Sequence, residues 1–196
     1  MTGTYESNSI PHHLDIKCPK CQGCAEFEFA EIVRINLKSE VDFFQKSSIF
    51  EYRQFQDSCG HIWHGALYFE ALHGSPNLAI HNLPPGYAPD DWAHSKYLRS
   101  RREFPVGALR CSHCGTRAKH ELAWPGDAYY SVGHRSQILW AYHRESAVEL
   151  AQYLSSTARD ISKYRWRSFL LHVPTTFKVR KAREAIVKQM SKLLAS

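Results

Sequence analysis

The sequence contains no long hydrophobic run. No stretch approaches the ~18 consecutive apolar residues of a membrane-spanning helix, although 43% of the 196 residues are hydrophobic. The first residues, Met1 to Glu6, do not show the basic and then apolar pattern of a signal segment. We therefore expect a cytoplasmic protein, without a membrane partner, that folds around an ordinary hydrophobic core.

Motifs typical of several enzyme classes are also missing. There is no Gly-rich phosphate loop, no His-Glu-x-x-His pair and no Gly-x-Ser-x-Gly turn. We therefore expect no enzymatic activity and no catalytic residues. One alternative is a zinc hydrolase, in which a ligand from His61 or His64 leaves a position for activated water and Asp57 or Glu70 acts as the base.

Four of the six cysteines form two Cys-x-x-Cys pairs. Because the cytosol keeps thiols reduced, such pairs indicate a metal site rather than disulfides. Each pair presents two sulfurs from one tight turn, and glycine at Gly115 permits the positive φ that such a turn needs. The sequence predicts one structural Zn²⁺ site without an open coordination position, formed by Cys18, Cys21, Cys111 and Cys114.

Other side chains offer alternative ligands. Cys59 with His61 or His64 could complete the shell of the first pair, because imidazole nitrogen and thiolate sulfur suit the same metal. The same residues could instead join Cys24 in a second site. The intact pairs are the preferred solution, since each already holds two sulfurs in a fixed arrangement.

Alternation of apolar and polar residues follows each Cys pair. Residues 27–37 place apolar side chains on odd positions, apart from a break at Glu31 and Ile32. This period of two predicts a half-buried strand with a bulge or bend at the break. Residues 118–124 alternate in the same way and predict another strand. Because each pair leads into a strand, we expect both turns to belong to one sheet.

The chain between the two pairs is rich in aromatic residues and in breakers of regular structure. Residues 43–56 and 62–69 predict strands on either side of a turn at residues 57–60. The many Pro and Gly residues of the segment 73–107 predict an irregular insertion. Within it, Asp90 can cap a short helix that continues through Leu98.

Helical signals dominate after the second strand. Residues 138–142 predict a short helix packed on the sheet. Ser146 and Glu149 form a capping box, which predicts a helix with a buried face of Val148, Leu150, Ala151 and Leu154. Thr175 or Thr176 can cap a final helix, whose apolar stripe is Val179, Ala182, Ile186, Met190 and Leu193.

Positive charge gathers at the C-terminal end. The net charge is +6, but residues 155–196 alone carry ten Lys or Arg and two acidic residues, or +8. Clustered cations attract phosphate backbones, and interleaved aromatics can stack on the bases of single strands. Tyr164, Trp166 and Phe169 are either such stacking residues or core residues between two helices. The predicted contact residues are Arg99, Arg101, Arg102, Lys163, Arg165, Arg167, Lys178, Arg180, Lys181 and Arg183.

The segments 17–23 and 110–115 resemble the knuckles of zinc ribbons, a group frequent among transcription, translation and nucleic-acid processing factors. This resemblance implies a zinc-ribbon-type β body. In its overall plan, small and basic with two widely spaced Cys pairs, the chain is also similar to the small zinc-containing Cas8-like subunit of type IV CRISPR complexes. That second resemblance implies a place in a nucleoprotein complex.

We therefore expect an α+β protein in three parts. A flexible lead-in covers residues 1–16, where the adjacent His12 and His13 could bind a metal but are expected to be exposed. A zinc-ribbon β domain covers residues 17–133 with its insertion at about 73–107, and a basic helical unit covers residues 134–196. The expected function is non-enzymatic binding of DNA or RNA, alone or in a larger complex. The alternative is an adaptor that docks on a protein partner.

Overall fold

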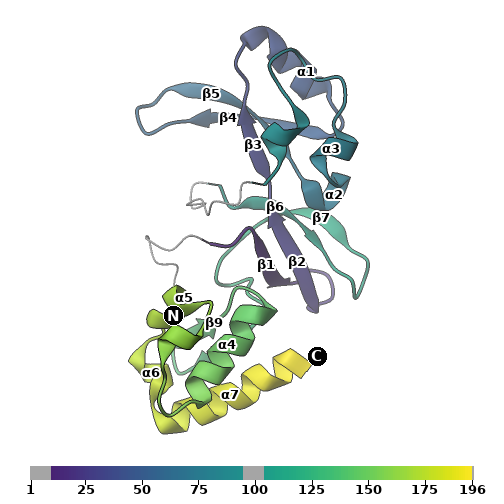
Figure 1. The fold of residues 1–196 in the computed structure, drawn as a ribbon. Coiled ribbons are helices and arrows are strands. Elements are labelled where there is room, and N and C mark those ends of the chain that lie inside the picture. The colour runs from purple at the N-terminus through teal and green to yellow at the C-terminus, as the bar shows by residue number, and fades with distance from the viewer. Residues whose placement is uncertain (1–9, 95–103, 196) are drawn as a thin grey trace.

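The computed structural model describes residues 10–94 and 104–195, which form three layers along one axis. A four-stranded sheet lies in the middle, a three-stranded sheet with short helices lies above it, and a helical unit lies below it (Figure 1). The fold is thus α+β with helices at the C-terminal end, which confirms the predicted fold class.

The central sheet has the strand order β1–β2–β6–β7, and every pair is antiparallel. Each Cys turn joins two neighbouring strands, so each forms a hairpin, and the pairing of β2 with β6 places the two hairpins side by side. The turn-then-strand repeat therefore lies in one sheet, as predicted. The strands are β1 (His13–Lys17), β2 (Cys24–Phe29), β6 (Val106–Arg110) and β7 (Arg117–Glu121).

The predicted strand at residues 27–37 is two strands in different sheets. β2 ends at Phe29, and β3 (Glu31–Arg34) begins a new sheet. Between them, the backbone N–H of Ala30 donates to the carbonyl of Val106 at 3.1 Å. The break in alternation thus marks the point at which the chain leaves one sheet for the next, rather than a bulge within one strand.

The upper sheet has the order β3–β5–β4 and carries the turn predicted at residues 57–60. There the carboxylate of Asp57 accepts hydrogen bonds from the N–H groups of Cys59 and His61, both at 2.9 Å. Its other strands are β4 (Phe50–Gln56) and β5 (Ile62–Tyr68). The prediction of a strand from residue 43 is wrong, because η1 (Lys38–Glu40) leads into helix α1 (Val41–Lys46), which buries Phe44 against Trp92.

The insertion is irregular over residues 74–94, which the structure describes, as its Pro and Gly content predicts. Its regular elements there are α3 (Pro76–Ala79) and the 3₁₀ helix η2 (Pro89–Trp92), and α2 (Glu70–His73) lies just before it. Asp90 lies within this single turn instead of opening a longer helix, and the rest of that predicted helix lies outside the described residues. Trp92 anchors the turn, since its indole N–H donates to the carbonyl of Ala66 at 3.0 Å.

The C-terminal unit begins with a hairpin, and the helix predicted at residues 138–142 is wrong. β8 (Ser131–His134) pairs with β9 (Gln137–Trp140) across a turn where Arg135 has φ 55°. Pairing with residues 131–134 decides the conformation here over the local pattern. The helical elements that follow are α4 (Arg144–Ser155), η3 (Ile161–Lys163), α5 (Arg167–Leu171), α6 (Thr175–Lys178) and α7 (Arg180–Ala195).

Two details of these helices differ from expectation. α4 begins at Arg144, so Ser146 occupies the third helical position rather than the cap. The buried residues of α4 include Leu150, Tyr153 and Leu154, whereas Val148 and Ala151 are half-buried. In α7 the stripe of Ala182, Ile186 and Met190 is buried as predicted. Val179 is instead 51% exposed, because it forms an extended break between α6 and α7.

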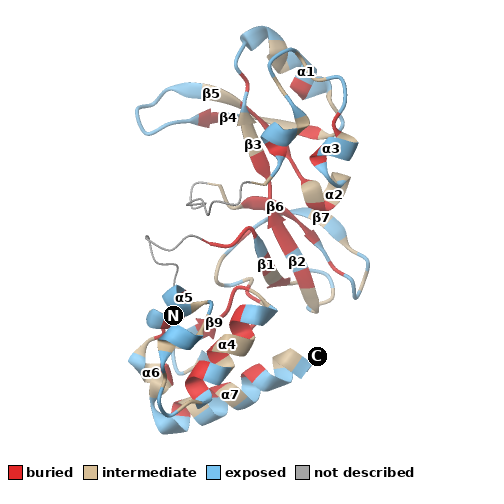
Figure 2. Cartoon of the chain, viewed as in Figure 1, coloured by how far each residue is buried: buried red, intermediate tan, exposed pale blue. Residues whose placement is uncertain are grey.

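The central sheet is covered on both faces (Figure 2). Phe27 and Leu109 pack in the core shared with the C-terminal unit. Val106 and Ala108 pack in the core beneath the upper sheet, which includes Phe69. This double cover holds the strands, and with them both Cys turns, in fixed positions.

Candidate metal centre

The two Cys turns have the same backbone hydrogen bonds. The N–H of Cys18 donates to the carbonyl of Gly23 at 2.8 Å, and the N–H of Cys111 donates to the carbonyl of Thr116 at 2.8 Å. In a second bond, the N–H of Gln22 donates to the carbonyl of Cys18 at 2.8 Å. The N–H of Gly115 donates in the same way to the carbonyl of Cys111 at 2.9 Å. Two sequences with little in common thus form the same turn.

Both turns place a left-handed residue directly after the second cysteine. Gly115 has φ 71°, as predicted from its glycine identity, and Gln22 has φ 61°. The non-glycine residue was not foreseen, because the adjacent Gly23 looks like the better candidate for this conformation. The Gln22 side chain donates to the Cys18 carbonyl at 3.3 Å, which ties it to the turn.

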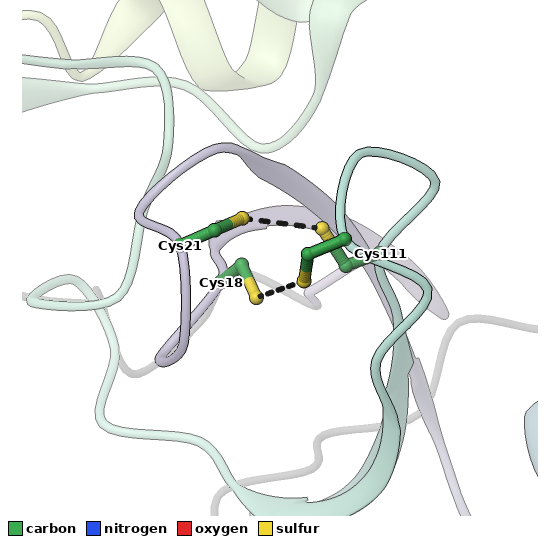
Figure 3. Close-up of side chains that lie close together, drawn as sticks. Cys18, Cys21 and Cys111 are labelled. Carbon is green, nitrogen blue, oxygen red and sulfur yellow. Dashed lines mark hydrogen bonds between the residues drawn. The ribbon is translucent and has the colours of Figure 1, made fainter.

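The four sulfurs converge between the two turns (Figure 3). The Sγ atoms of Cys18 and Cys114 are 3.7 Å apart, and those of Cys21 and Cys111 are 3.6 Å apart. A disulfide requires ~2.05 Å between sulfurs. A tetrahedral ion with Zn–S bonds of ~2.3 Å separates its sulfurs by ~3.8 Å. The spacing therefore fits four thiolates around one ion.

Electrostatics also favour a cation at this position. A backbone hydrogen bond from Gly23 lowers the pKa of Cys21, but burial and the three neighbouring sulfurs raise it to about 12. Hydrogen bonds from Thr116 instead lower the pKa of Cys114 to about 6. One thiolate is thus readily formed while its neighbour resists ionisation. A bound divalent cation would stabilise all four thiolates together.

The alternative ligands lie elsewhere. Cys24 is paired within β2, and burial, with the charge of Asp15, raises its pKa to about 12. Cys59 and His61 form a separate exposed group with Asp57 on the β4–β5 turn. His64 lies on β5, where its Nδ1 hydrogen-bonds the Tyr52 hydroxyl at 2.7 Å. The first Cys pair is therefore completed by the second pair.

Several of the predicted nucleic-acid contact residues are engaged within the protein. Ion pairs join Lys163 to Asp160 at 3.8 Å, Arg165 to Glu145 at 3.4 Å and Arg180 to Glu184 at 3.2 Å. The ammonium group of Lys178 lies 5.7 Å from the ring centre of Tyr153. Arg167 and Lys181 are exposed and Arg183 is half-buried, whereas Arg99, Arg101 and Arg102 lie outside the described residues.

The aromatic residues among these cations belong to the core. Phe169 is 3% exposed, and Tyr164 and Trp166 pack against the same cluster. Arg165 and Arg167 face outward. Of the two alternatives left open by the sequence, the structure places Phe169 in the core, while Tyr164 and Trp166 are half-buried against it.

Sequence reasoning missed one cluster of histidine and glutamate side chains. His12, expected to be exposed, is 5% exposed and lies against Glu28, Glu31 and His94. His94 follows 82 positions after His12, and no motif links the two residues. Only the meeting of the two sheets brings them together.

Among the described residues, no helix combines the length and apolar character needed to cross a membrane. Comparison of the chain with protein-family models, with curated proteins and with solved structures finds no match. The metal centre is therefore interpreted from its own geometry.

Proposed function

We propose that this protein is a zinc-stabilised, non-enzymatic nucleic-acid-binding protein or a subunit of a nucleoprotein complex. The observation that carries the proposal is the exposed basic face of α7, attached to a body in which the cysteine cluster links two hairpins of one sheet. The cytoplasmic location expected from the sequence is part of the same proposal.

Zinc is the metal that suits this cluster best. Four thiolates in a tetrahedral arrangement are typical of structural zinc sites, and oxygen-preferring ions such as Mg²⁺ and Ca²⁺ do not bind such a soft ligand set. Since four protein sulfurs fill the shell, no position remains for water, and the cluster acts as a scaffold.

The basic face of α7 consists of Lys181, Lys188 and Lys192. All three are exposed, and their spacing of seven and then four residues places them on one side of the helix. The buried residues, including Ile186, lie on the other side and hold the helix to the body. This arrangement favours binding to a phosphate backbone, because each neutralised phosphate releases condensed counterions.

The double variant Lys181→Gln and Lys188→Gln tests this surface. Glutamine keeps the helix propensity and removes two charges. We expect weaker binding to mixed-sequence RNA and DNA oligonucleotides in fluorescence anisotropy, with the slope of log K against log salt reduced by about 1.4 to 1.8.

The matched control is Lys38→Gln with Lys46→Gln, which removes the same charge from exposed positions near α1. This control should retain wild-type affinity. An equal loss of affinity in both variants would show that only the net charge of the protein matters. Unchanged affinity in the α7 variant would reject the surface. A stoichiometric protein partner that survives nuclease treatment would favour the adaptor instead.

A further inference from the structure

A cluster of histidine and glutamate side chains lies where the central sheet meets the upper sheet. His12 precedes β1, Glu28 lies on β2, Glu31 begins β3, and His94 follows η2. His12 and Glu28 are each 5% exposed and Glu31 is 7% exposed. Burial of two carboxylates is costly unless cations or hydrogen bonds stabilise them.

Two stacked imidazole rings each place a nitrogen near the same oxygen of Glu31. One of its carboxylate oxygens, Oε1, is 3.5 Å from Nδ1 of His12 and 3.1 Å from Nδ1 of His94. The two imidazole rings stack with their centres 3.6 Å apart and an interplanar angle of 19°. The three ligand atoms all lie within 4.8 Å of one another.

These separations match those between ligands that share one metal ion. Around an ion with bonds of ~2.1 Å to nitrogen and oxygen, neighbouring ligand atoms are ~3.0 Å apart in octahedral and ~3.4 Å apart in tetrahedral geometry. The distances from Glu31 to the two histidines are 3.5 Å and 3.1 Å. The stack of the two imidazole rings would have to open for both nitrogens to face one ion together with the Glu31 carboxylate.

Glu28 supplies the second part of the arrangement. Its Oε1 lies 3.1 Å from Nε2 of His12, the ring nitrogen away from Glu31. A carboxylate that accepts the Nε2–H proton directs the lone pair of Nδ1 toward Glu31. Metal-binding histidines are commonly held in this way, with a carboxylate on the nitrogen that does not bind the ion.

We propose that His12, Glu31 and His94 form a second metal site, which binds a divalent first-row transition ion such as Zn²⁺ or Fe²⁺, with Glu28 as the residue that positions His12. Two imidazoles and one carboxylate are typical of open sites, which leave a coordination position for water or another ligand. This site is chemically distinct from the cysteine cluster, which offers sulfur alone. It therefore gives a different spectroscopic signature.

Cobalt separates the two sites. Full-length protein loaded with one equivalent of Zn²⁺, which fills the thiolate cluster, is titrated with Co²⁺ and followed by absorption and calorimetry. We expect one Co²⁺ per chain with visible d–d bands and without a thiolate-to-cobalt charge-transfer band. His94→Gln should weaken Co²⁺ binding at least 10-fold, and Glu28→Gln should weaken it about 10- to 100-fold.

The matched control is His81→Gln, an exposed histidine of the same insertion, which should bind Co²⁺ as the wild type does. Retention of one zinc per chain shows that each variant is folded and that the cysteine cluster is intact. If the zinc-loaded wild type does not bind Co²⁺, the cluster is a buried ion-pair network without a metal, and the proposal is overturned. Undiminished binding in His94→Gln would overturn it as well. Neither outcome affects the proposed nucleic-acid surface.

Discussion

At the scale of single residues, backbone conformation after the second cysteine distinguishes the two cysteine turns. Gly115 adopts φ 71° without cost, whereas Gln22 adopts φ 61° with a side chain attached. A left-handed conformation costs roughly 1–2 kcal/mol for a residue with a Cβ atom. The first turn therefore carries a strain that the second avoids, and its hydrogen bond to Cys18 helps to offset this strain.

Gly115→Ala should lower the free energy of unfolding by about 1 kcal/mol, because alanine is strained at positive φ. A Cβ atom there would meet no atom within 4 Å, so the effect isolates the backbone conformation. The control is Gly133→Ala on β8, where a Cβ atom also has open space and no positive φ is required. Urea unfolding of both variants gives the comparison, and equal stabilities would contradict the assignment of strain.

At the scale of elements, the start of α4 depends on a reciprocal cap. Nδ1 of His143 faces the N–H of Ser146 at 3.5 Å, and the hydroxyl of Ser146 accepts from the N–H of His143 at 3.0 Å. The sequence indicates a capping box at this point, but the box lies three residues earlier than the one expected from Ser146 and Glu149. Histidine was overlooked as a cap because serine, threonine and aspartate are the common ones.

Ser146→Ala should destabilise the protein by about 1 kcal/mol, because it removes the buried Ser146 hydroxyl and leaves the N–H of the half-buried His143 without its acceptor. Ser155→Ala at the other end of α4 is the control, since its exposed hydroxyl only bonds back to the Ala151 carbonyl. Thermal unfolding monitored by circular dichroism measures the stability of both variants. A larger loss in the Ser155 variant would contradict the cap.

At the scale of the whole molecule, the cysteine cluster joins segments that are far apart in the chain. Cys21 and Cys111 are separated by 90 positions, and the upper sheet is built entirely from the chain between them. A link of this length removes considerable conformational freedom from the unfolded chain. A metal bound by the four cysteines would close the loop from which the upper part of the molecule is built.

Removal of the metal by a chelator should therefore destabilise the whole protein. Loop closure alone accounts for about 3–5 kcal/mol, which corresponds to a decrease of roughly 6–20 °C in Tm. Differential scanning calorimetry before and after chelation, and again after addition of Zn²⁺, measures the change. Cys111→Ser should show the same loss, whereas Cys59→Ser should bind metal and unfold as the wild type does. A chelated protein with unchanged Tm would exclude a structural metal.

The sequence alone determines the chemistry of the cysteine turns. A Cys-x-x-Cys spacing and a glycine after it are local features, and local geometry follows from neighbouring residues, so the two turns and the strands that follow them, β2 and β7, were predictable. The strands before the turns were not: β1 (His13–Lys17) lies in the expected flexible lead-in, and β6 (Val106–Arg110) begins in the expected irregular insertion. The α+β class and the buried stripe of α7 followed from periodicity for the same reason.

The tertiary structure decides which segments meet. Residues 27–37 continue one pattern through two sheets, and residues 138–142 form a strand only because residues 131–134 pair with them. His12 and His94 approach one another only where these sheets join. Contacts of this kind depend on the packing of distant elements, and the alternation or spacing of neighbouring residues contains no record of them.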